Sequence, residues 1–76
     1  MIKFIEYWMF ATHIWHDTEP TPVAINLREI LRIEEMFDKA LGKYVAIYLK
    51  DHSVIPIEGD IINVLAEFQK HLTNMY

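Results

Sequence analysis

Residues 2–11 constrain this fold most strongly, because they are rich in β-branched and aromatic side chains and are apolar throughout an extended segment. Strand alternation divides the large side chains into two sets: Phe4, Trp8 and Phe10 on one face, and Ile5, Tyr7 and Met9 on the other. A strand with two apolar faces has to be covered on both sides, either by other elements of the same chain or by another subunit.

A β-hairpin is predicted over residues 43–58. Alternation within residues 43–50 places one apolar set on each face: Val45, Ile47 and Leu49 on the first, and Tyr44, Ala46 and Tyr48 on the second. Asp51-His52-Ser53 forms a short turn that lacks glycine, and residues 54–58 make the return strand. Pro56 donates no ladder hydrogen bond, so we expect the return strand to lie at a sheet edge.

The end of the chain predicts an α-helix over residues 60–73. Asp60 can cap the first amides of this helix, and Gly59 lets the chain turn into it. Apolar side chains recur there at helical spacing and form one stripe that can pack on a sheet: Ile61, Val64, Leu65, Phe68 and Leu72.

Residues 26–42 allow two interpretations. Local signals favour a helix, with Asn26 and Glu29 as a capping box and Gly42 as its stop. The alternative is a strand at residues 23–26, a turn at 27–30 and a second strand at 31–36. The residues alone leave both interpretations open.

Two segments together resemble the FlbD-type small β proteins, which are met in flagellar operons and, in a similar layout, among phage proteins. The segments are Pro22-Val-Ala-Ile-Asn-Leu-Arg-Glu-Ile-Leu-Arg-Ile-Glu-Glu35 and Tyr44-Val-Ala-Ile-Tyr-Leu-Lys-Asp-His-Ser-Val-Ile-Pro-Ile57. The resemblance implies two strands within residues 23–36 and brings no active site with it. This sequence departs from the family pattern at His52, where the family has a turn glycine, and in residues 12–21, which are longer than the family's turn.

These elements predict a single domain over residues 1–76. It is an α+β fold, in which a small antiparallel β-sheet or open barrel of about four to five strands carries one C-terminal helix. Asp and Glu outnumber Lys and Arg by 11 to 7, which argues against a nucleic-acid partner. Cysteine, a signal peptide and an apolar span of ~20 residues are all lacking, so we expect a cytoplasmic protein without a membrane partner.

No catalytic motif stands out. Ser53 is the only serine and is next to His52 in sequence, an arrangement that does not give the geometry of a catalytic triad. The two glycines are isolated, so there is no glycine-rich phosphate loop. The chain has four histidines and no cysteine, so a closed four-ligand zinc site at His13 and His16 would have to borrow His52, His71 or a second subunit. We therefore expect a non-catalytic binding protein with no cofactor and no metal.

Residues 12–21 are the longest irregular connection and place a tryptophan between two histidines. Aromatic and guanidinium groups suit a small anionic planar ligand, such as a nucleotide-like signal. The predicted ligand-binding residues are Trp15, His13, His16, Arg28 and Arg32. A phage-type protein that sequesters such a ligand at an inter-subunit pocket would be an example. The alternative is a regulatory or inhibitory module of the FlbD type that acts on a protein partner.

The apolar surface also predicts a homodimer or a higher homo-oligomer. A helix is ~10 Å across, whereas four or five strands span ~19–24 Å, so one helix cannot cover a whole face of the sheet. The aromatic residues expected at the subunit interface are Tyr7, Trp8, Phe10, Tyr44 and Tyr48.

Overall fold

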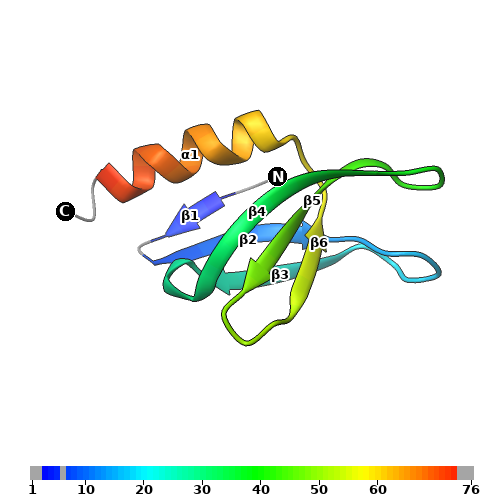
Figure 1. Ribbon diagram of the computed structural model, residues 1–76, viewed down its shortest axis with the longest axis horizontal. Coiled ribbons are helices and arrows are strands. Elements are labelled where there is room, and N and C mark those ends of the chain that lie inside the picture. Colours follow the sequence, from blue (N-terminus) through cyan, green and yellow to red (C-terminus); the bar gives the residue numbers. More distant parts are fainter. Residues whose placement is uncertain (1–2, 6, 74–76) are drawn as a thin grey trace.

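The computed structural model describes residues 3–5 and 7–73, which form an antiparallel sheet followed by one helix (Figure 1). The strands of this described part are β1 (Lys3–Ile5), β2 (Trp8–His13), β3 (Thr21–Asn26), β4 (Ile30–Asp38), β5 (Gly42–Leu49) and β6 (Val54–Ile57). A 3-10 turn, η1 (Leu27–Glu29), joins β3 to β4, and α1 (Ile61–Thr73) follows β6. The predicted α+β class with a C-terminal helix is confirmed.

Residues 26–42 form strands rather than an α-helix. The Asn26 side chain does act as a cap, since its Oδ1 accepts the Arg28 amide at 2.9 Å, but the turn that it opens is the short η1. β4 then pairs with β5 from Ile30 opposite Leu49 to Asp38 opposite Gly42. This long-range pairing outweighs the local helical signals, because strand formation depends on neighbouring strands more than on intrinsic preference.

β2 is the strand that joins the two halves of the sheet. β3 pairs with every residue of β2 and so occupies one of its edges. The opposite edge is shared between β1, which pairs with residues 8–10, and β6, which meets β2 where His13 lies opposite Ile57. The sheet continues from β6 to β5 and β4. No pairing between β3 and β4 is present in the described residues, so the sheet does not close into a barrel.

Two details differ from the expectations. The expected edge position of β6 is wrong, since β6 lies between β5 and β2. Its pairing with β2 is short, and Pro56 takes part through its carbonyl, which accepts the Ile14 amide at 3.1 Å. The strand expected over residues 2–11 is divided, because a turn at Tyr7 separates β1 from β2. The side chains of Phe4 and Ile5 lie outside the described part of the structure.

The core lies between one face of the sheet and α1, which contacts β4 (Figure 1). Asp60 caps this helix through its Oδ1, which accepts the Ile62 amide at 2.8 Å. Leu65 is 41% exposed and so departs from the predicted stripe, and the side chain of Leu72 lies outside the described part. The described residues contain no helix of the length and hydropathy needed to cross a membrane. The buried core residues are Met9, Ala11, Ile25, Leu27, Val45, Ile47, Ile57 and Val64.

Candidate functional site

A pocket lies on the face of the sheet that points away from the core. It covers parts of β4, β5 and β6 and has a volume of about 330 Å³, at the lower end of the range for small-molecule sites. We call it the aromatic pocket. Its lining residues are His13, Trp15, Met36, Tyr44, Ala46, Tyr48, Val54 and Pro56.

Strand register builds the floor of the aromatic pocket. Tyr44, Ala46 and Tyr48 alternate with the buried core residues of β5, so they share the opposite face of the sheet. Met36 lies opposite Tyr44 on β4, and Pro56 lies opposite Ala46 on β6. Three neighbouring strands therefore place an almost continuous apolar surface beneath the pocket.

Trp15 borders one side of the aromatic pocket. It lies in the irregular loop 14–20 between β2 and β3, and its ring meets that of Tyr44 edge-on, with the centroids 6.1 Å apart. The ring of His16 lies edge-on to the same indole at 5.2 Å. Thr18 donates its hydroxyl to the Trp15 carbonyl at 3.0 Å. Trp15 is 44% exposed and Tyr44 only 8%, so the tryptophan stands at the surface against a buried tyrosine.

A hydrogen bond between two side chains connects the loop of Trp15 to the β4–β5 hairpin. The Nε2–H of His16 donates to Oδ2 of Asp38 at 2.8 Å, while Oδ1 of Asp38 accepts the amides of Ala40 and Leu41 at 2.8 and 3.2 Å. The His16 hydrogen bond, followed by that from the Ala40 amide, holds the pKa of Asp38 below its ordinary value of 3.8. Asp38 is therefore charged at neutral pH and joins the two hairpin tips that extend side by side in Figure 1.

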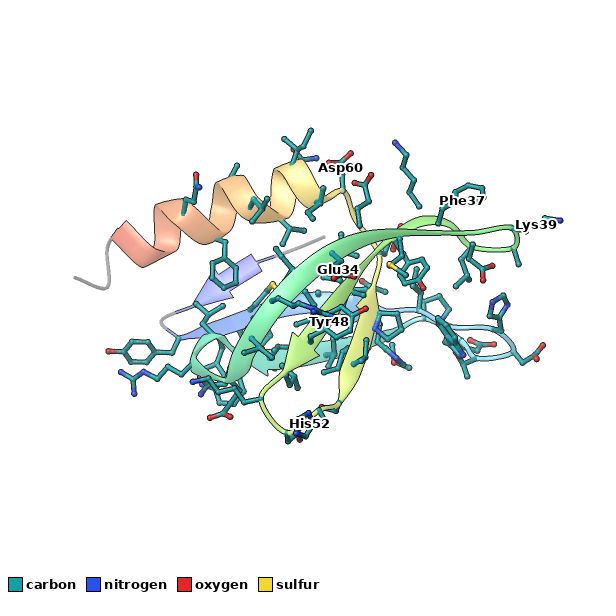
Figure 2. The ribbon with its side chains drawn as sticks, viewed as in Figure 1. Glu34, Phe37, Lys39, Tyr48, His52 and Asp60 are labelled. Carbon is teal, nitrogen blue, oxygen red and sulfur yellow. The ribbon has the colours of Figure 1, made fainter. Side chains whose placement is uncertain are left out.

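Arg32 and Glu34 flank the opposite end of the aromatic pocket, near Tyr48. The guanidinium carbon of Arg32 lies 4.2 Å from the centroid of the Tyr48 ring. Glu34 contacts both of these residues: its Oε1 lies 3.3 Å from Nε of Arg32, and its Oε2 accepts the Tyr48 hydroxyl at 3.2 Å. Figure 2 shows Glu34 and Tyr48 on these neighbouring strands. The arrangement holds an exposed guanidinium beside a ring of the pocket.

The structure brings together four of the five predicted ligand-binding residues. His13 and Trp15 line the aromatic pocket, His16 holds the loop of Trp15, and Arg32 covers a ring of the lining. Arg28 lies elsewhere, in η1, where its guanidinium carbon is 4.0 Å from the Tyr7 ring centroid.

The residues expected at a subunit interface fall into two places. Trp8 and Phe10 are 43% and 38% exposed on the face of β2 that points away from the core, and Tyr7 is exposed just before them. Tyr44 and Tyr48 line the aromatic pocket on β5. Both groups therefore lie on the face of the sheet that points away from the core, one at β2 and the other on β5.

Sequence reasoning missed two kinds of residue in this site. Met36 and Pro56 reach the aromatic pocket only through the register of β4 and β6 with β5, which local patterns do not specify. Glu34 and Asp38 matter through contacts with residues far away in sequence. The described residues hold no group of three or more His, Cys, Asp or Glu that could bind a metal.

A comparison of the chain with protein-family models, curated proteins and solved structures finds no match.

Proposed function

We propose that this chain is a non-catalytic, homo-oligomeric binding protein whose aromatic pocket takes a small planar anionic ligand of nucleotide-like chemistry. The observation that carries the proposal is the grouping of Trp15, Tyr44 and Tyr48 around one apolar pocket. Aromatic side chains stack on planar rings, and such stacking contributes ~1–3 kcal/mol per base.

Arg32 supports the anionic part of the proposed ligand. Its guanidinium already lies over Tyr48, so little conformational freedom is lost when it meets a ligand at this end of the aromatic pocket. A guanidinium carries five N–H donors, so the contact between its Nε and Glu34 is compatible with a further contact to a carboxylate or a phosphate.

The homo-oligomeric part of the proposal is supported by Trp8 and Phe10. They are neighbours on the outer face of β2, and their cross-strand partners on β3 are Asn26 and Ala24, which do not cover them. We propose a second copy of the chain as their partner, in a two-fold dimer, because this is the commonest closed assembly. The cytoplasmic location expected from the sequence belongs to the same proposal.

Native mass spectrometry of the protein purified from cells tests the proposal. We expect a mass of two or more chains that carries a small aromatic anion, and we expect Trp15→Ala to remove that added mass. Trp8→Phe is the control, because it changes the other tryptophan and should keep the ligand. A bare chain of 9.1 kDa in all three preparations would contradict both parts of the proposal.

A further inference from the structure

Trp15 stands between two hollows of different character. On one side is the aromatic pocket, and on the other is a second hollow of about 400 Å³ between the tips of the β2–β3 and β4–β5 hairpins. Trp15 lines both of them. The second hollow is the more polar one, since Thr18, Lys43 and Glu58 contribute to its wall. Trp15 thus contributes to the walls of both an apolar and a polar space, and we call this residue the partition.

Few contacts hold this partition in place. Residues 15–20 lie outside the ladders of the sheet, and the Thr18 hydroxyl bonds to the Trp15 carbonyl within the same loop. Within the described part of the chain, one polar side-chain contact joins residues 15–20 to another element. It is the hydrogen bond from His16 to Asp38. Asp38 is itself fixed by the amides of Ala40 and Leu41, so it provides a rigid point of attachment.

We infer that His16 and Asp38 are positioning residues that fix Trp15 as the wall of the aromatic pocket and thereby limit the pocket to one planar ring system. Without this hydrogen bond the loop can move away from Tyr44, the two hollows join, and a longer molecule can enter. The size limit rests on the proposed function, whereas the position of Trp15 can be measured in the protein without any ligand.

The first experiment follows Trp15 in the free protein. Trp8→Phe leaves Trp15 as the single tryptophan, since the chain has two. In this background, His16→Phe removes the N–H donor but keeps a flat ring, His16→Gln restores a donor, and His52→Phe changes a histidine of the β5–β6 turn as the control (Figure 2).

We expect His16→Phe to raise acrylamide quenching of Trp15 about twofold, because the held side chain is 44% exposed and the released one becomes fully exposed. His16→Gln and His52→Phe should both stay near the parent protein. Equal quenching of Trp15 in the parent and in His16→Phe would overturn the positioning role, whatever the chain binds.

The second experiment measures selectivity with two planar anions of different size. Indole-3-acetate has one fused ring system, and 8-anilinonaphthalene-1-sulfonate has two separate ones. We expect His16→Phe to shift the ratio of their dissociation constants about tenfold towards the larger probe, and His16→Gln to restore it. An unchanged ratio would overturn the size limit. Failure of both probes to bind the parent protein would contradict the proposed function and the size limit together, while the quenching result would still decide the position of Trp15.

Discussion

The guanidinium carbon of Arg32 lies 4.2 Å above the centroid of the Tyr48 ring, and Arg28 lies over Tyr7 in almost the same way at 4.0 Å. Both are arginine–tyrosine stacks at the surface, but only Tyr48 lines the aromatic pocket. The chain therefore contains its own matched control for the role of a stacked arginine in ligand binding.

The first prediction compares Arg32→Ala with Arg28→Ala. Removal of Arg32 should weaken binding of a planar anion such as AMP about tenfold, the effect of losing a hydrogen bond to a charged group. The loss should be larger at low salt than at high salt, because salt screens exposed charges. Arg28→Ala should leave the affinity almost unchanged. Isothermal titration at two salt concentrations measures both, and equal losses in the two variants would contradict the site.

The second prediction separates binding from stability at Trp15. Trp15→Ala should weaken binding roughly 5- to 150-fold, since stacking contributes ~1–3 kcal/mol. The melting temperature should change little, because Trp15 is 44% exposed. Ile47→Ala is the comparison: Ile47 is fully buried, and its truncation should cost about 2–5 kcal/mol. If Trp15→Ala lowers the melting temperature as much as Ile47→Ala does, Trp15 is a core residue and the site is wrongly placed.

The third prediction concerns acid. The pKa of Asp38 is lowered in the folded protein by hydrogen bonds from His16 and Ala40, so the charged carboxylate favours folding. The resulting stabilisation is present above the ordinary value of 3.8 and is lost as the pH falls through the lowered pKa. His16→Phe removes the hydrogen bond from His16, which is the main cause of the lowered pKa. The titration midpoint of Asp38 should therefore move up towards the ordinary value.

NMR titration of the Asp38 carboxyl carbon measures this shift directly. Urea unfolding at several pH values should show the parent protein more stable than His16→Phe near pH ~5, with the difference shrinking at lower pH. Identical Asp38 midpoints in the two proteins would contradict the contact between His16 and Asp38.

The fourth prediction follows from the turn between β5 and β6. His52 has φ 73°, a left-handed conformation that costs an L-residue roughly 1 kcal/mol and glycine almost nothing. His52→Gly should therefore raise the free energy of unfolding by about 0.5–1 kcal/mol, which corresponds to a few degrees in melting temperature. Lys50→Gly is the comparison. Lys50 is not among the positive-φ residues of the described part, so a glycine there should lower the free energy of unfolding. A drop in melting temperature for His52→Gly would show that its side chain stabilises the turn.

The fifth prediction concerns assembly. Sedimentation at micromolar concentration should give the mass of at least two chains, and Trp8→Glu should reduce it to 9.1 kDa. The variant should keep its circular dichroism, because Trp8 is 43% exposed. Ile62→Glu on α1 is the control, since it changes another exposed apolar residue and should not alter the mass. A parent protein that sediments at 9.1 kDa would exclude the proposed oligomer.

Periodicity predicted the parts of the fold that depend on local pattern. The alternation of residues 43–50 corresponds to β5, and the apolar spacing after Asp60 corresponds to α1. The secondary structure of residues 27–41 could not be predicted in the same way. Their apolar spacing fits a helix, but the pairing of β4 with β5 outweighs this local pattern. The edge position inferred from Pro56 failed for a related reason: sheet order depends on which strands meet in three dimensions.

The candidate site was predictable where it depends on residue type. A tryptophan between two histidines in a long connection pointed to Trp15 and His13, and both line the aromatic pocket. Arg28 lies outside the aromatic pocket, because η1 and the register shift between Ile30 and Arg32 separate the two arginines in space. Asp38 gave no signal, since its partner His16 lies 22 residues away in sequence.

Binding of a planar anion in the aromatic pocket can be measured residue by residue, by NMR titration of the 15N-labelled protein with the four 5′-nucleoside monophosphates. We predict saturable shifts at the Trp15 indole N–H and at the amides of Ala46 and Tyr48 with at least one nucleotide, and weaker binding of the matching nucleoside, which lacks the phosphate. Shifts confined to the outer face of β2 around Trp8 and Phe10, or no shifts up to ~10 mM of any nucleotide, would contradict binding in the aromatic pocket.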